Sequence, residues 1–258
     1  MALTPQQQIA IMRPVTRVLK ATGLRGPVMR ARKAAVRQRR ALVERRGSDR
    51  LSHPALHDLD RKLDRIIDRD GGFFVEAGAN DGFTQSNTYW LERFRGWRGL
   101  LVEPMQELAD EARRERPTAH VVRCALVPAG FEDATVRMRF GDLMSTVSGS
   151  RNDEPDWTAA GLALGWRDPY EADVPARTLS SILDEIQAPE VDLLSLDVEG
   201  FEAPVLRGLD MARHAPRFVL VEMHDRAEQG PDVEAALGER YGEPEQLSPM
   251  DWLYRRQD

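Results

Sequence analysis

From Gly72 onward, short apolar runs alternate with stretches of helical pattern, and this alternation limits the fold more than any other feature of the sequence. Strands connected through helices favour a parallel sheet with helices on its faces. The run 191–198 is nearly continuous in apolar residues, as expected of a strand buried on both faces. We therefore predict an α/β domain with strands at residues 73–78, 99–104, 119–126, 134–140, 191–198, 217–225 and 251–256.

Helices are expected between these strands, and one segment is irregular. Residues 141–173 form a stretch that is long for a structureless loop in a compact domain, and such loops are usually functional. The segment carries Trp157, Trp166 and Tyr170, and aromatic faces stack well on sugar rings and apolar chains. We predict that it is a lid that shapes a substrate site. The helices are expected at residues 86–94, 105–116, 177–186, 202–209 and 233–241.

The beginning of the chain differs from the rest in charge. Of 258 residues, the first 50 hold 13 Lys and Arg against Glu44 and Asp49, whereas the remainder holds 23 basic and 40 acidic residues. Residues 28–46 have good helix-forming composition, but basic residues surround most of this helix, which favours a solvated arm. Residues 51–69 have apolar side chains at spacings of three and four, typical of a helix packed on a domain. The expected organisation is a basic helical extension, 1–50, followed by an α/β domain, 51–258.

Several classes of protein are excluded by what the sequence lacks. No apolar run approaches the roughly 20 residues of a membrane-spanning helix, and the first residues make a poor signal peptide. The single cysteine, Cys124, allows neither an internal disulfide nor a zinc cluster. No G-x-S-x-G segment occurs, which removes the simplest hydrolase interpretation. We expect a protein of a reducing compartment, the cytoplasm.

The first candidate site follows the strand at residues 73–78. This strand ends at Glu76 and runs into a turn with Gly78, Asn80 and Gly82 before a helix begins. Glycine allows unusual backbone dihedrals and close approach of a ligand, and such turns bind nucleotide-like ligands at the carboxyl ends of doubly wound sheets. The spacing is not the dinucleotide fingerprint G-x-G-x-x-G. A purely structural turn is the alternative.

A second carboxylate, Glu103, ends the next strand, where an acidic side chain can accept both hydroxyl hydrogens of a ribose. Together, Glu76 and Glu103 suit a ligand with a ribose and an ammonium group, and they would repel a pyrophosphate. The pattern therefore favours S-adenosylmethionine over a dinucleotide. Two alternatives stay open: Glu103 caps the following helix, or the protein is an NAD-type oxidoreductase on a related sheet.

The third candidate site lies at the ends of two buried strands. Asp197 and Glu199 follow the strand 191–198, and Glu222 and His224 end the strand 217–225. Charge at a buried strand end is costly unless it is paired or used. If the two strands are neighbours, Asp197, Glu222 and His224 converge on one edge of a pocket.

Several segments together carry a family pattern: Glu76-Ala77-Gly78-Ala79-Asn80-Asp81-Gly82, Ser86-Asn87-Thr88, Glu103-Pro104, Cys124-Ala125-Leu126, Asp197-Val198-Glu199-Gly200 and Val205-Leu206-Arg207-Gly208. In them the sequence resembles the FkbM family of S-adenosylmethionine-dependent methyltransferases, over about residues 70 to 256. The resemblance implies the Rossmann-like, seven-stranded class I methyltransferase sheet with helices on both faces. It also implies O-methylation, commonly of a hydroxyl of a sugar, glycolipid or polyketide-type natural product.

The resemblance further implies roles for single residues. Glu103 would bind the ribose, and Asp197 would face the amino group or the acceptor. The residues around the methionine portion would be Glu76, Gly78, Asn80 and Asp81, with Asn87 as a further cofactor-binding residue. Cys124 and Ala125, through Leu126, would line the adenine edge.

Methyl transfer to a hydroxyl needs a group that removes a proton. His224 is the best candidate for this base by its intrinsic pKa, with Glu222 or Asp197 orienting it or the acceptor. The alternative is that His224 only satisfies local hydrogen-bond partners. A divalent cation held by Asp197, Glu222 and Asp225 is a further, less favoured alternative.

The partners stay open at this point. The basic extension is either a solvated helix or a segment attracted to anionic lipid headgroups, which would suit a lipid-linked sugar acceptor and a peripheral membrane location. Aromatic side chains that would stack on bases are missing from it, which argues against nucleic acid. A homo-oligomer is a further expectation, and a catalytically silent cofactor-binding or scaffold module is the non-enzyme alternative.

Overall fold

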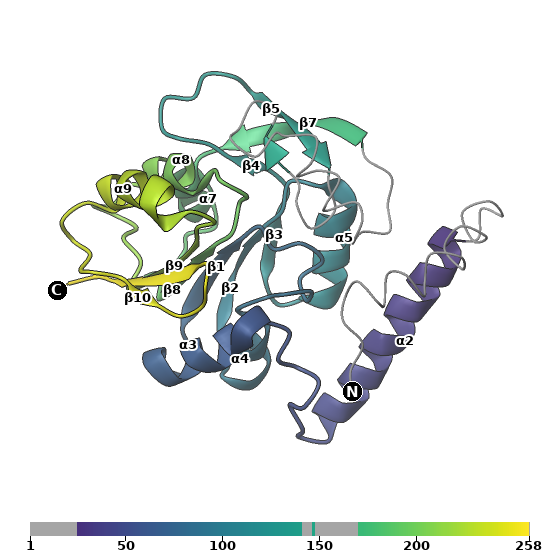
Figure 1. Cartoon of the computed structure of the whole chain (residues 1–258). Coiled ribbons are helices and arrows are strands. Elements are labelled where there is room, and N and C mark those ends of the chain that lie inside the picture. The colour runs from purple at the N-terminus through teal and green to yellow at the C-terminus, as the bar shows by residue number, and fades with distance from the viewer. Residues whose placement is uncertain (1–24, 141–145, 148–169, 258) are drawn as a thin grey trace. The chain divides into compact units, whose positions relative to one another are not determined.

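The computed structural model describes residues 25–140, 146–147 and 170–257 (Figure 1). Contacts divide the chain into two compact units, Met1–Ser52 and His53–Asp258. In the first unit, helix α2 (Arg25–Arg45) covers nearly all of the segment 28–46 predicted to be helical. All the strands that the structure describes lie in the second unit.

The main sheet of the second unit has seven strands in the order β10-β11-β9-β8-β1-β2-β3. The strands from β3 to β9 pair in parallel, whereas β11 runs antiparallel to β9 and β10 antiparallel to β11. The prediction of a seven-stranded sheet of the class I methyltransferase type is confirmed. The strands are β1 (Phe73–Ala77), β2 (Arg98–Val102), β3 (His120–Val122), β8 (Leu193–Leu196), β9 (Phe218–Glu222), β10 (Glu245–Gln246) and β11 (Asp251–Arg255).

Helices cover both faces of this sheet because successive side chains of a buried strand point to opposite sides. In β1, Phe74 packs on one side of the sheet, in the core beneath a first group of three helices. Phe73 and Val75 pack on the other side, in the core beneath a second group of three helices. The first group is α3 (Leu59–Ile67), α4 (Tyr89–Phe94) and α5 (Gln106–Glu115). The second group is α7 (Leu179–Glu185), α8 (Glu202–Arg207) and α9 (Arg226–Leu237) (Figure 1).

The order of the strands decides where a ligand can enter. From β1 the chain continues to β2 and β3 on one side, and it later returns to β8 on the other side of β1. At such a switch point the loops after the two neighbouring strands diverge, and a crevice opens at the carboxyl ends of the strands. The predicted site residues Glu76, Glu103 and Asp197 all lie at the ends of strands at this edge of the sheet.

A second sheet was not predicted. It has four strands in the order β4-β7-β5-β6, namely β4 (Ala125–Leu126), β5 (Thr135–Phe140), β6 (Thr146–Val147) and β7 (Tyr170–Arg177). The predicted strand 119–126 is therefore wrong as a single element, because the chain leaves the main sheet after β3 and joins the small sheet at β4.

The C-terminal end of the predicted lid, residues 141–173, belongs to a strand in the structure. Tyr170 begins β7, where it pairs with Phe140, and its hydroxyl donates to Glu107 Oε2 at 2.6 Å. It therefore ties the small sheet to α5 and does not belong to an irregular loop. Trp157 and Trp166 lie outside the described residues.

Candidate functional site

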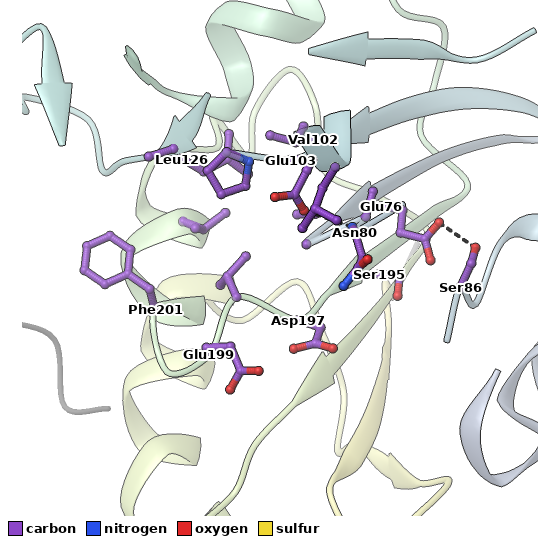
Figure 2. A pocket seen from close by; sticks show the side chains of 18 of the residues that line it. Glu76, Asn80, Ser86, Val102, Glu103, Leu126, Ser195, Asp197, Glu199 and Phe201 are labelled. Carbon is purple, nitrogen blue, oxygen red and sulfur yellow. Dashed lines mark hydrogen bonds between the residues drawn. The ribbon is translucent and has the colours of Figure 1, made fainter. Parts of the chain in front are cut away.

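A pocket opens at the carboxyl ends of β1, β2 and β8 (Figure 2). Its wall comes from the turn after β1, the end of β2, strand β4 and the turn after β8. All but one of the residues predicted to bind the cofactor line it: Glu76, Gly78, Asn80, Asn87, Glu103, Cys124, Ala125 and Asp197.

Gly78 brings the two sides of the pocket together. It has φ +83°, and a Cβ added to it would lie 1.8 Å from the backbone oxygen of Asp197. No side chain fits in that space, so only glycine lets the turn after β1 pass directly against the end of β8.

Glu76 is buried and holds a loop. Its carboxylate accepts hydrogen bonds from Ser86 Oγ (2.9 Å), the backbone N–H of Asn87 (2.8 Å) and Thr88 Oγ1 (2.6 Å). These contacts explain why α4 begins at Tyr89 and not at residue 86: the preceding residues are bound to Glu76 in a loop. A direct contact of Glu76 with a ligand stays a prediction.

Asp81 is the residue that the structure does not place with the others. It is not among the residues that line the pocket. Its Oδ1 accepts from the backbone N–H groups of Phe83 (3.1 Å) and Thr84 (2.7 Å), and its Oδ2 accepts from Thr84 Oγ1 (3.0 Å). Asp81 stabilises the turn, as short acidic side chains commonly do, and its expected contact with the methionine portion stays a prediction.

Glu103 lies at the centre of the wall, facing Asn80 (Figure 2). Its two oxygens accept hydrogen bonds from the backbone N–H groups of Asn80 and Met105, each at 2.9 Å. A carboxylate has about four acceptor sites, so roughly two remain for other donors. Burial raises the pKa of Glu103 to about 7. The second of these bonds comes from Met105, the residue directly before α5, and α5 itself has no side-chain cap hydrogen bond, so the structure does not support the capping alternative.

The far end of the pocket is apolar. Leu126 and Phe201 lie across the pocket from Glu76 in Figure 2. Cys124 is fully buried, and burial raises the pKa of its thiol to about 12, so it stays protonated at neutral pH. Cys124 is therefore a wall residue and not a nucleophile.

The acids after β8 and β9 form a pair. Asp197 and Glu222 hydrogen-bond to each other, and burial raises the pKa of both. The charge of Glu222 raises the pKa of Asp197 further, to well above its usual range. Two carboxylates in one site cannot both ionise easily, so each acid disfavours ionisation of the other. The expected neighbourhood of these two acids is present, and Asp197 faces the pocket (Figure 2).

His224 meets a different acid. Its Nε2 lies 3.5 Å from Glu199 Oε2, and this contact raises the pKa of the imidazole. Neither His224 nor Glu222 is among the residues that line the pocket. The role of His224 as the base stays a prediction.

No group of three His, Cys, Asp or Glu side chains that could hold a metal ion occurs in the described part of the chain. Asp225, a member of the alternative cation site, instead caps α9 by accepting from the backbone N–H groups of Ala227 and Glu228. Among the described helices, none is both long enough and apolar enough to cross a membrane.

Two residues that matter to the wall were missed. Glu202 accepts from the N–H groups of Val198 (3.2 Å) and Gly200 (2.9 Å) and thereby shapes the turn after β8. Arg116 is fully buried beneath the loop that Glu76 binds. No sequence signal marks Arg116, because it follows an exposed-looking run of arginine and glutamate.

Comparison with known proteins gives a family. The model of the methyltransferase FkbM domain matches residues 76–244. No curated protein matches the sequence. Similar solved structures include a methyltransferase FkbM from Methylobacillus flagellatus, with 16% identity, 72% of this chain and 44% of that chain covered, and a TM-score of 0.45. The chain thus spans less than half the length of that protein.

Two further structures are similar at the same level. One is a TehB-like S-adenosylmethionine-dependent methyltransferase from Corynebacterium glutamicum (14% identity, 90% and 100% covered, TM-score 0.42). The other is an O-methyltransferase from Bacillus cereus in complex with S-adenosylhomocysteine (13% identity, 87% and 91% covered, TM-score 0.43). Since the FkbM model matches well over half of the sequence, from the end of β1 to beyond α9, the chain belongs to the FkbM family of S-adenosylmethionine-dependent methyltransferases.

Proposed function

We propose that the protein is an O-methyltransferase that acts on a hydroxyl of a sugar, glycolipid or polyketide-type natural product. The observation that carries this proposal is the Asp197–Glu222 pair beside the pocket, because a hydroxyl must lose a proton when it accepts a methyl group. The pair has room for a second proton, and its raised pKa values bring it closer to the neutral range in which a general base is effective.

The pocket suits S-adenosylmethionine. Glu103 keeps acceptor sites for ribose hydroxyls, and the apolar walls of Leu126 and Phe201 suit a flat base. Asn87 Oδ1 is buried and without a partner in the described part of the protein, so it would accept a hydrogen bond from a bound ligand. When bound, this methyl donor supplies a methyl group on a positively charged sulfur.

The chain itself would orient the acceptor and move its proton. The bound donor would give its methyl group to the acceptor oxygen and keep the bonding electron pair on its sulfur, so the part of the protein is to hold the acceptor and take its proton. Asp197 takes the hydroxyl proton on one oxygen and passes its own proton to Glu222. We assign to His224 the task of pairing with Glu199, at 3.5 Å, and not the task of base.

Helix α2 favours an acceptor at a lipid surface. It holds eight Lys and Arg against one Glu, and Val28, Val36 and Leu42 on it are 43%, 54% and 49% exposed. Basic charge with exposed apolar side chains is attracted to anionic headgroups. Vesicles with phosphatidylglycerol should sediment the protein at low salt, and removal of residues 1–50 or high salt should abolish this. Equal sedimentation of the shortened chain would exclude the role.

A binding and transfer experiment tests the main proposal. Calorimetry should detect binding of S-adenosylmethionine and S-adenosylhomocysteine but not of NAD, and a radioactive methyl group should pass to a hydroxyl-rich acceptor panel. Stabilisation by NAD alone would favour the oxidoreductase alternative. Cofactor binding without transfer to any acceptor would favour the silent module.

A further inference from the structure

Arg116 has the most unusual environment of the described basic residues. Its side chain is 0% exposed and lies directly after α5. Its Nε is 2.6 Å from Glu92 Oε2, and its Nη1 is 3.6 Å from Glu76 Oε2. The guanidinium also lies over the rings of Phe74 and Tyr89, at 5.1 and 5.5 Å. Burying a charge is costly, and a neutral core would be an easier way to stabilise the fold, so this arginine calls for an explanation beyond stability.

Arg116 and Glu76 bind the same two hydroxyl groups. Arg116 Nη1 donates to Ser86 Oγ (3.3 Å), and Nη2 donates to Thr88 Oγ1 (3.1 Å). Both hydroxyls donate their single proton to Glu76 Oε2, at 2.9 and 2.6 Å. Because each hydroxyl has one proton, its direction is fixed by an acceptor on one side and a donor on the other. The loop containing Ser86 and Thr88 is therefore clamped between two opposite charges.

The residue between the two hydroxyls is Asn87, which lines the pocket. Its backbone N–H donates to Glu76 Oε1 (2.8 Å), and its Nδ2 donates to Ser195 Oγ (3.0 Å). These bonds fix both the backbone and the amide plane. They leave the buried Oδ1 as an acceptor without a partner among the described residues. A buried acceptor costs free energy until a donor reaches it, which points to an N–H or O–H group of a ligand.

We propose that the Glu76–Arg116 pair is a positioning device that aims Asn87 Oδ1 at the ammonium group of the methyl donor's amino-acid portion. This rests on the proposed function, since it assumes that the pocket takes S-adenosylmethionine. The ammonium group is the expected partner for two reasons. The ribose hydroxyls are matched by Glu103, and the acids Glu76, Asp197 and Glu199 on the same wall favour a cationic group. Glu76 then contributes through its charge and through the loop geometry that it fixes.

The test compares two ligands that differ only in this portion. S-adenosylhomocysteine carries the ammonium and carboxylate groups, whereas 5′-methylthioadenosine has the same nucleoside and a thioether but no amino acid. By calorimetry, Asn87→Ala and Arg116→Met should weaken S-adenosylhomocysteine about tenfold or more. They should change the affinity for 5′-methylthioadenosine less than about twofold.

Arg113→Met is the matched control, because Arg113 lies on α5 and pairs with Asp110 at the surface. It should leave the affinity for both ligands unchanged. Arg116→Lys should not restore wild-type affinity, since an ammonium group lacks the planar fork that reaches both hydroxyls. If Arg116→Met does not fold, Thr88→Val removes one clamped hydroxyl and carries the same expectation.

The outcomes separate the two proposals. An equal loss of affinity for both ligands in the variants would mean that Arg116 has a structural role only. An unchanged affinity for S-adenosylhomocysteine in Asn87→Ala would exclude the amide contact. Either result overturns the positioning proposal. Failure of the wild-type protein to bind S-adenosylhomocysteine would instead overturn the proposed function.

Discussion

The two halves of the pocket treat buried carboxylates in opposite ways. At the tip of β1, Glu76 accepts three hydrogen bonds and lies close to the Arg116 guanidinium. At the tips of β8 and β9, Asp197 faces three other acids, Glu222, Glu199 and Glu202, all of which raise its pKa. We call these regions the donor edge and the proton edge.

The difference has a physical origin. At the donor edge, three hydrogen-bond donors and the nearby Arg116 guanidinium contact Glu76, so this carboxylate holds a loop in place. Neighbouring acids and burial favour the protonated form, so the proton edge keeps a group that can exchange a proton. Acidic residues on neighbouring strands of one sheet thus have two different roles. Those at the donor edge hold a loop in place, and those at the proton edge are suited to proton transfer.

The largest expected effect is at the proton edge. Asp197→Asn removes the carboxyl group that would take the hydroxyl proton, and kcat should fall by about 10²- to 10⁴-fold. The affinity for S-adenosylhomocysteine should change much less, because Glu103 and the apolar wall remain. Steady-state kinetics with calorimetry on the same preparation measure both. An unchanged kcat would remove Asp197 from the mechanism.

At the donor edge the expected effect is on stability. Glu76→Ala removes the acceptor of three hydrogen bonds and leaves Arg116 buried with one partner fewer, and breaking a buried ion pair costs about 3–5 kcal/mol. Glu222→Gln, its counterpart at the proton edge, relieves repulsion while keeping a polar group beside Asp197, so the free energy of unfolding should change by less than about 1 kcal/mol. Urea denaturation compares the two variants. Equal losses would contradict the distinction between the edges.

The pH dependence of cofactor binding reports on Glu103, which follows β2, belongs to neither edge, and has a pKa that burial raises to about 7. Ribose hydroxyls prefer the ionised carboxylate, so affinity for S-adenosylhomocysteine should rise about tenfold from about pH 6 to about pH 8. Calorimetry across this range measures the rise, and Glu103→Gln should flatten it. A rise that persists in Glu103→Gln would assign it to another group.

Glu103 also affects the free energy of unfolding, and this effect has the opposite dependence on pH. Between its ordinary pKa of 4.5 and about 7, the folded state keeps a proton on Glu103 that the unfolded state has lost. The unfolded state then binds fewer protons, so the contribution of Glu103 to stability falls as pH rises through this window. Urea denaturation of wild type and Glu103→Gln at both ends of the window measures that contribution.

The smallest effect is expected for His224. It lies outside the pocket lining and pairs with Glu199 at 3.5 Å, so His224→Gln should lower kcat by less than about threefold. Turnover at saturating donor tests this. A loss comparable to that of Asp197→Asn would restore His224 as the base.

Much of the frame of the site could be predicted from the sequence. The apolar runs that end in Glu76, Glu103 and Asp197 became β1, β2 and β8, because long buried strands leave a strong pattern. Carboxylates at the ends of parallel strands then had to meet at one edge. The two-residue strands β4 and β10 could not be predicted in the same way, since so short a pairing has no periodic signal.

What the sequence determined by itself is the alternation of strands and helices in the main sheet and the family, because apolar periodicity and short motifs are local properties. Which acid meets which partner was decided only by the tertiary structure. Arg116 reaches Glu76 across 40 residues of chain, and His224 lies 3.5 Å from Glu199. Such contacts depend on how loops from separate strands pack, and the free energy of a buried charge depends on those neighbours more than on its place in the chain.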